Sequence, residues 1–159
     1  MIHKPKILFL DEPTSGLDPE SVLHVNTMIK NLAENEGTTI FLCTHQLRYA
    51  QDICSTYGLI DNGVMLAAGN LEELRAMVFS GFTVSIKTDL FPQDVNSIKI
   101  GEMDYEMKVN SEDEIPYIIK RIVGDGGNIY NVTARRLLLE EIYFTLFDKR
   151  AGREEPQND

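Results

Sequence analysis

The sequence predicts an α/β lobe with parallel strands, followed by a small α+β domain. Two observations predict the lobe: apolar runs at residues 7–10 and 38–43 have the composition of strands, and an amphipathic segment with helical spacing separates them. A strand–helix–strand unit forms a parallel sheet with a right-handed crossover. A third observation predicts the second domain, because short alternating segments replace this pattern after Gly81.

Two adjacent carboxylates end the first apolar run. Residues 7–10 read Ile-Leu-Phe-Leu and are followed by Asp11 and Glu12, a turn with Pro and Gly, and Asp18. Such a run is typical of a buried parallel strand, and ligands of open α/β sheets bind off the carboxyl ends of these strands. Because ionised carboxylates resist burial, a metal-bound ligand and an activated water explain the pair better than a solvated strand end does.

A helix and a second strand follow in the order that a parallel sheet requires. Asp18 can cap the helix, and Gly37 can end it. The second strand, residues 38–43, is followed by Thr44 and His45, so a histidine closes this strand as the acids close the first. Imidazole has a pKa near neutral pH, so either of its protonation states can serve at such a position.

The first domain comprises residues 1–80. After the second strand it reads as a short helix, a hairpin and a capped helix. The hairpin is predicted by Asn62-Gly63 between two apolar segments. Asn70, with Glu73 three residues later, predicts a capping box at the start of the next helix.

The second domain, residues 82–148, has the element order β-α-β-β-α-β, which suggests a small ferredoxin-like sandwich. In this reading, residues 89–96 hold one or two helical turns, and a last helix spans about 136–148. Residues 149–159 read as a flexible tail.

The run Ile7–Asp18 resembles the Walker B motif and D-loop of ABC-type ATPases, a P-loop NTPase family. Residues 38–45 resemble the strand and switch histidine that follow in that family. The resemblance implies that Asp11 holds the Mg²⁺ of Mg-ATP through its water shell and that Glu12 polarises the attacking water. It also implies that His45 contacts the γ-phosphate and orients Glu12.

The same resemblance implies partners and a location. The loop that contains Ser15 and Asp18 would reach across a homodimer interface toward the partner's nucleotide. The intact protein would dock on a transmembrane transporter subunit and lie in the cytoplasm, peripheral to the inner face of the membrane. Leu-Glu-Glu at 139–141 resembles the end of an accessory domain on ATPase subunits of drug, antibiotic and sodium exporters.

The chain contains no G-x-x-x-x-G-K-[ST] phosphate-binding loop and no Ser-Gly-Gly signature. In the family both precede Walker B, so we expect this chain to be the later part of the domain and to be inactive alone. Two alternatives stay open: a soluble ABC-type ATPase that acts in translation or DNA repair, and a non-catalytic interaction module.

Composition excludes some other classes. The net charge of −10 disfavours non-specific nucleic-acid binding, which needs clustered Lys and Arg. The sequence has no apolar run near the ~20 residues of a membrane span. Cys43 and Cys54 lack metal-type spacing and read as free thiols, with Cys43 inside a predicted core strand.

Overall fold

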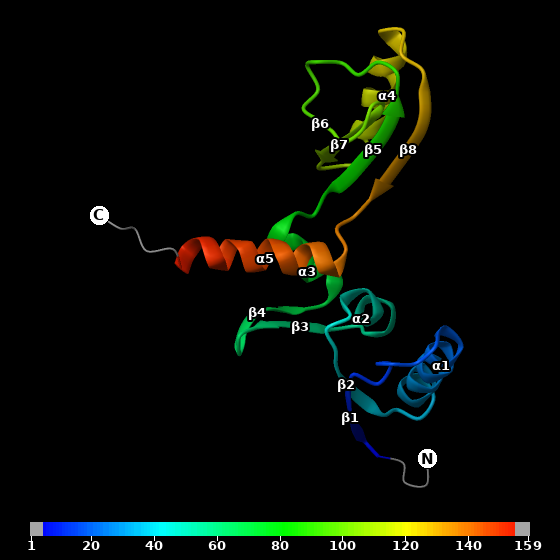
Figure 1. The fold of residues 1–159 in the computed structure, drawn as a ribbon, viewed down its shortest axis with the longest axis vertical. Helices are drawn as coiled ribbons and strands as arrows, with labels where there is room; N and C mark the ends of the chain where they lie inside the picture. The colour runs from blue at the N-terminus through cyan, green and yellow to red at the C-terminus, as the bar shows by residue number, and fades with distance from the viewer. Residues whose placement is uncertain (1–4, 155–159) are drawn as a thin grey trace.

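The molecule is elongated (Figure 1). The first strand lies near one end, the chain then runs to the other end, and the last helix returns to the middle. The computed structural model describes residues 5–154. Residues 1–4 of the first predicted domain and residues 155–159 of the predicted tail lie outside the described residues. The elements group into a first unit, a middle unit and a far unit.

The first unit is the predicted strand–helix–strand unit. It consists of β1 (Ile7–Asp11), α1 (Pro19–Glu34) and β2 (Thr39–Cys43). β1 and β2 pair in parallel with Phe9 opposite Phe41, so the predicted parallel arrangement is confirmed. α1 begins where the sequence predicts, because the Asp18 carboxylate accepts hydrogen bonds from two backbone N–H groups of the first turn, both at 3.1 Å.

One face of the β1–β2 pair is uncovered among the described residues. α1 packs on the other face, where Ile29 and Leu32 are buried. On the uncovered face Phe9 is 74% exposed and Phe41 is 55% exposed, and their rings stack with centroids 5.1 Å apart. The prediction that the first apolar run is a buried strand is therefore wrong for this structure. A single helix can cover only one face of a two-stranded sheet.

The middle unit contains the predicted hairpin and capped helix. Its first elements are α2 (Leu47–Ile53), β3 (Tyr57–Asp61), β4 (Val64–Gly69) and α3 (Leu71–Val78). Asn62 and Gly63 join β3 to β4 with φ angles of 46° and 77°, and positive φ at both positions is what a type I′ turn requires. Asn70 and Glu73 exchange side chain–backbone hydrogen bonds at the start of α3, which confirms the capping box.

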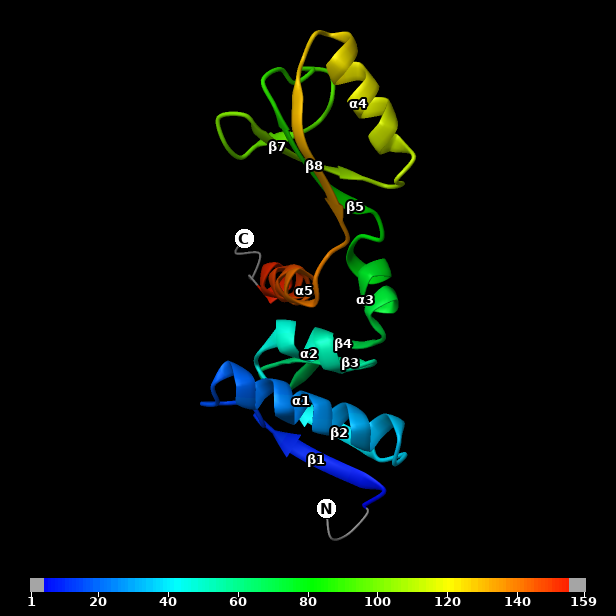
Figure 2. The ribbon, with the colours of Figure 1, turned by 90° about the vertical axis from the view of Figure 1, so that its right-hand side faces the viewer.

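The last helix, α5 (Leu139–Glu154), belongs to the middle unit although the far unit precedes it in sequence. Leu139 and Ile142 are almost completely buried in one core with Leu74 of α3. Figure 2 shows α5 beside α3 and above α2. The sequence predicts this helix over residues 136–148, but it begins at Leu139 and continues to Glu154, so the first part of the predicted tail is helical.

The far unit is a four-stranded antiparallel sheet with one helix. Its elements are β5 (Phe82–Thr88), β6 (Ile98–Lys99), β7 (Asp104–Val109), α4 (Glu114–Gly124) and β8 (Ile129–Arg135). The strand order β6-β7-β5-β8 is the order of a ferredoxin-like sheet, so the predicted α+β class is confirmed. α4 and the sheet share a core in which Ile86 and Ile122 are almost completely buried.

The first helix of the predicted ferredoxin-like order is missing from the far unit. Residues 89–96 form turns and irregular structure, so the predicted helical turns are wrong. Pro92 restricts the backbone of the residue before it away from helix. In addition, the Asp89 carboxylate accepts hydrogen bonds at 2.8 Å from the backbone N–H and the side-chain amide of Asn128, which holds this segment against the start of β8.

Candidate active site

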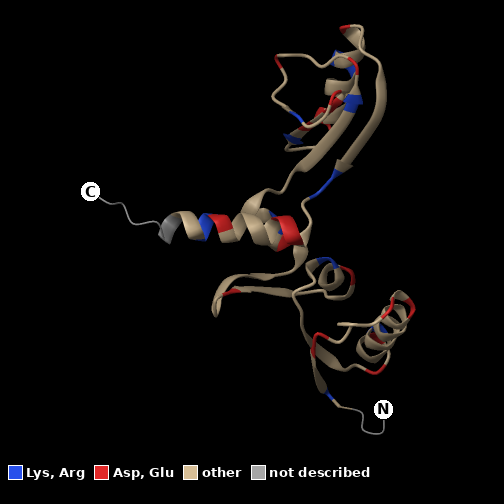
Figure 3. Ribbon diagram, in the orientation of Figure 1, with Lys and Arg blue, Asp and Glu red and all other residues tan. Residues whose placement is uncertain are grey.

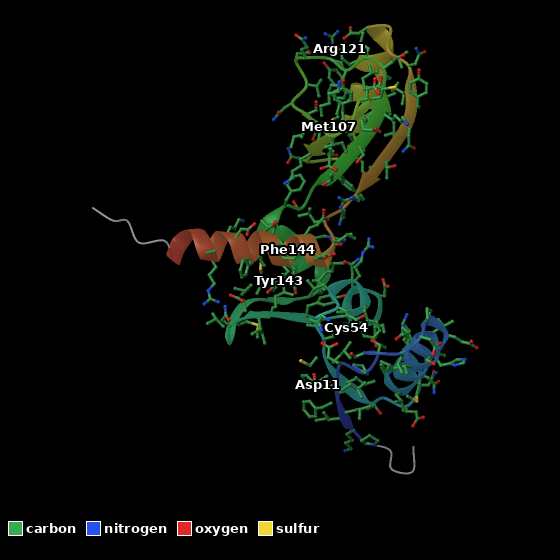
Figure 4. The ribbon with its side chains drawn as sticks, in the orientation of Figure 1. Asp11, Cys54, Met107, Arg121, Tyr143 and Phe144 are labelled. Carbon is green, nitrogen blue, oxygen red and sulfur yellow. The ribbon has the colours of Figure 1, made fainter. Side chains whose placement is uncertain are left out.

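The carboxyl ends of β1 and β2 lie side by side in the first unit, where Figure 4 labels Asp11. Asp11 is opposite Cys43 in the register. The backbone N–H of Glu12 donates to the Cys43 carbonyl at 2.9 Å, so the ladder continues one residue beyond β1. Glu12 has a φ of 44°, in the left-handed region that is uncommon for residues other than glycine. The chain therefore turns sharply at Glu12, which lies beside the end of β2.

The Glu12 carboxylate is held by the two residues that follow β2. The Thr44 hydroxyl donates to Oε2 at 2.9 Å, and the His45 backbone N–H donates to Oε1 at 2.7 Å. The His45 ring also contacts Oε1, with Nδ1 at 2.7 Å. The fold thus brings together Glu12 and His45, the two residues predicted to be catalytic, although they are 33 positions apart.

The same contacts favour the ionised form of Glu12. Partial removal from water opposes its ionisation, but the hydrogen bonds from the His45 backbone, the His45 ring and the Thr44 hydroxyl outweigh this and lower its pKa. An ionised carboxylate only accepts hydrogen bonds, so His45 Nδ1 carries the proton in their contact. The other ring nitrogen, Nε2, then has no role in holding Glu12. The His45 side chain is 80% exposed and that of Glu12 is 29% exposed, so the imidazole lies on the open side of the pair.

Asp11 is exposed at the end of β1, and its negative charge raises the pKa of the neighbouring Cys43 thiol. Cys43 is itself exposed, so its predicted place in a core strand is wrong. Residues 5–154 contain no group of three or more His, Cys, Asp or Glu side chains that could hold a metal ion. A single accessible carboxylate still fits Mg²⁺, which commonly keeps several waters and binds one or two carboxylates together with substrate phosphates.

Ser15 and Asp18 lie in the loop between β1 and α1. Asp18 is committed to the helix, because in addition to capping α1 it accepts a hydrogen bond from the Ser21 hydroxyl at 2.6 Å. These hydrogen bonds lower the pKa of Asp18. The Ser15 backbone N–H donates to the Glu12 carbonyl at 3.0 Å, which closes a tight turn, while the residue is exposed. The geometry therefore joins Ser15 to the turn that follows Glu12.

Sequence reasoning missed the part that Thr44 plays. The sequence pattern marks Thr44 only as a polar residue after the second strand and assigns it no role. A signal was available: parallel strands end at one edge, so the two residues after β2 must lie near the two residues after the neighbouring β1. That the hydroxyl would contact Glu12, and not solvent, depends on side-chain directions that strand spacing alone does not give.

In the first unit acidic residues outnumber basic ones, and Figure 3 shows acidic segments at the end of β1 and along α1. An anionic ligand such as a nucleotide phosphate is repelled by such a surface unless a cation accompanies it. The surface charge therefore suits a ligand that arrives with a divalent cation.

Comparison with known proteins gives relatives of one kind. No protein-family model matches the chain. It is 30% identical over 149 residues to the uncharacterized ABC transporter ATP-binding protein YdbJ of Bacillus subtilis, an alignment that covers 89% of this chain and 47% of YdbJ. This chain is a homologue of ABC transporter ATP-binding proteins.

Two further relatives of this chain carry more specific names. Linearmycin resistance ATP-binding protein LnrL of Bacillus subtilis is 25% identical, with 92% of this chain and 51% of LnrL covered. Methionine import ATP-binding protein MetN 1 of Staphylococcus aureus is 28% identical, with 77% of this chain and 39% of MetN 1 covered. The chain thus spans about half the length of the curated relatives it matches, or less.

The helices of this chain can be compared with what a membrane span requires. Within residues 5–154, no helix combines the length and the apolar character that crossing a membrane requires.

Proposed function

We propose that this chain is the later part of the ATP-hydrolysing subunit of an ABC transporter, in which Glu12 polarises the attacking water and His45 contacts the γ-phosphate. The observation that carries the proposal is that Thr44 and His45, the two residues after β2, hold the Glu12 carboxylate. Three hydrogen bonds hold one carboxylate beside an exposed imidazole, at the sheet edge where ligands of α/β proteins bind. Homology to ABC ATP-binding proteins supports the same reaction.

The chemistry follows from the ionisation of the pair. With its pKa lowered, Glu12 stays ionised at neutral pH, so it can accept a hydrogen bond from water and orient that water for attack. His45 Nδ1 is occupied by Glu12, so Nε2 is the ring atom that can reach a phosphate oxygen. Asp11 would hold Mg²⁺ through waters, and the ion would neutralise charge on the phosphates.

The partners follow from the same proposal. Two copies of the intact subunit would form a homodimer, with the exposed Ser15 reaching toward the partner's nucleotide while Asp18 keeps the loop in shape by capping α1. The intact subunit would dock on a transmembrane component at the cytoplasmic face of the membrane. An exporter is favoured because the alignment with LnrL, a resistance protein, covers more of this chain than the alignment with MetN 1, an import protein.

The domain division belongs to the proposal as well. Residues 1–80 would be the last part of the nucleotide-binding domain, and residues 82–148 would contain its accessory domain. The location of α5 suggests a refinement: the accessory sheet would be an insertion between α3 and α5, and α5 would complete the core of the first domain.

The test supplies what this chain lacks. We would fuse it to a preceding segment that carries a phosphate-binding loop and compare Glu12→Gln with Glu34→Gln, a matched change at the exposed far end of α1. Glu12→Gln should leave Mg-ATP binding largely intact and lower turnover by ~10²-fold or more, as expected when a general base is lost. Glu34→Gln should change neither quantity, and near-normal turnover of Glu12→Gln would overturn the proposal.

A further inference from the structure

We propose that Thr44 is a positioning residue for Glu12, and that its hydroxyl fixes which acceptor site of the Glu12 carboxylate is left open for a water. This inference rests on the proposed role of Glu12. It concerns a residue to which neither the sequence nor the family resemblance assigned a task.

The Thr44 hydroxyl has one possible direction for its hydrogen. Thr44 is half-buried, and its Oγ1 accepts a hydrogen bond from the Gln46 backbone N–H at 3.1 Å. A hydroxyl group has one proton and two lone pairs. The Gln46 contact uses a lone pair, so the proton remains for the contact with Glu12 Oε2 at 2.9 Å, where the ionised carboxylate can only accept.

Three hydrogen bonds occupy acceptor sites of the Glu12 carboxylate. An ionised carboxylate offers about four lone-pair sites, two on each oxygen. Oε1 receives both the His45 N–H and the His45 ring nitrogen, so its two sites are used. Oε2 receives Thr44, and none of the hydrogen bonds in the described part of the chain occupies its remaining site. One site on Oε2 is therefore the position from which Glu12 can accept a hydrogen bond from water.

Without the Thr44 hydroxyl the carboxylate would lose a fixed orientation. The two contacts from His45 both end on Oε1, so they act as a pivot about which Oε2 can swing. Thr44 is the second point of attachment, and it comes from the end of β2, whose backbone is fixed by the ladder to β1. A displacement of about 1 Å in a catalytic group can lower a rate by ~10²-fold, so the second attachment affects the reaction and not only the fold.

The first experiment uses the 159-residue chain and does not depend on ATP. Side-chain ¹³C relaxation of Glu12 would be measured by NMR in the wild type, Thr44→Val and Thr44→Ser, with Thr39→Val as a matched change at the start of the same strand. Thr44→Val should increase the mobility of the Glu12 carboxylate, and Thr44→Ser, which keeps the hydroxyl, should restore the wild-type value. Equal mobility in Thr44→Val and the wild type would overturn the proposal.

A fourth variant covers the case in which Thr44→Val does not fold. Thr44→Cys keeps a weak donor in place of the hydroxyl. The mobility of Glu12 should then rise from Thr44→Ser to Thr44→Cys, and the absence of that rise would overturn the proposal in the same way.

The second experiment is a double-mutant cycle in the fusion that restores hydrolysis. Thr44→Val should lower kcat by ~10-fold or more with little change in the KM for Mg-ATP, because it disturbs orientation and not binding. In a Glu12→Gln background, Thr44→Val should have almost no further effect, since Thr44 acts through Glu12. Additive effects of the two substitutions would overturn the proposal.

The two experiments separate two kinds of failure. If Glu12→Gln keeps normal turnover, the proposed function fails, while the NMR measurement still decides whether Thr44 orients Glu12. If Glu12→Gln is inactive and Thr44→Val has the activity of the wild type, the proposed function stands and the role of Thr44 is refuted.

Discussion

The side-chain Oε1 of Gln51 in α2 accepts a hydrogen bond from the backbone N–H of Leu139 at 2.7 Å, across 88 positions of sequence. This contact fixes the start of α5 on the middle unit. Arg75 strengthens the junction by donating to the Leu137 carbonyl at 2.8 Å, and Arg136 pairs with Glu72. The far unit is therefore attached by two adjacent connections, and the helix that follows it completes a core built by earlier residues.

Truncating a buried residue of α5 should destabilise the middle unit. Ile142 is fully buried in the core that contains Leu74. Ile142→Ala should lower the free energy of unfolding by roughly 2–5 kcal/mol, the usual cost of removing a buried branched side chain. Urea unfolding followed by circular dichroism would measure it, with Phe144→Ala as the comparison because Phe144 is exposed. A smaller loss for Ile142→Ala than for Phe144→Ala would contradict this account of α5.

The far unit should fold without the first eighty residues, and it should not need α5. Its core lies between the sheet and α4, and Leu139 and Ile142 of α5 belong to the other core. Segments 81–135 and 81–148 should both unfold cooperatively on heating, with modest stability because they are small. Circular dichroism melts would compare them. A featureless melt of both segments would mean that the far unit depends on the middle unit.

The stability of the chain should depend on the ionisation of Glu141. Hydrogen bonds from Arg135 at 2.6 and 2.9 Å, together with one from the Leu138 backbone at 2.8 Å, lower the pKa of Glu141 below its ordinary value of 4.5. A carboxyl group whose folded pKa is depressed stabilises fully above its unfolded pKa, and this contribution is lost as the pH falls through the folded pKa.

Glu141→Gln should therefore lower the melting temperature at pH 7 and reduce the further loss that the wild type shows on acidification below pH 4.5. Melting temperatures between pH 7 and pH 3 would be compared with those of Glu140→Gln, which alters an exposed neighbour on the same helix. Equal acid dependence in Glu141→Gln and the wild type would count against the ion pair as the cause.

The purified chain alone should neither bind Mg-ATP tightly nor hydrolyse it. It has Asp11, Glu12 and His45 but no loop that cradles the phosphates, and phosphoryl transfer depends mostly on positioning and charge stabilisation. Isothermal titration and a phosphate-release assay should show nothing above background. Micromolar affinity or steady turnover that Glu12→Gln abolishes would require a phosphate site outside the pattern described above.

The uncovered face of the first unit should cause self-association. Phe9 and Phe41 line an open hollow whose other walls include Met65 and the exposed ring of Phe144. Exposed apolar patches of this kind promote association in water. Light scattering should show oligomers that Phe9→Ser reduces, whereas Tyr117→Ser, at an exposed aromatic on α4, should not. A monodisperse monomer of the unmutated chain would contradict this prediction.

Features built from neighbouring residues were predictable. The Asp18 cap of α1, the Asn62-Gly63 turn and the Asn70–Glu73 capping box each need only hydrogen bonds and φ angles within a few residues, and the structure contains all three. The pairing of β1 with β2 was predictable as well, because a helix of this length between two strands leaves few alternatives to a parallel arrangement.

The sequence by itself thus determined most of the elements and the parallel β1–β2 pair, because caps, turns and strand–helix–strand spacing are set by local chemistry; the helical turns expected at residues 89–96 are the exception. Tertiary structure alone decided the rest. Phe9 is exposed because burial depends on what packs over a strand, and no strand pattern contains that information. α5 lies in the middle unit because its apolar face fits the core around Leu74, a contact between distant residues. Thr44 holds Glu12 because two strand ends place a hydroxyl 2.9 Å from one carboxylate oxygen, a distance that only the folded backbone sets.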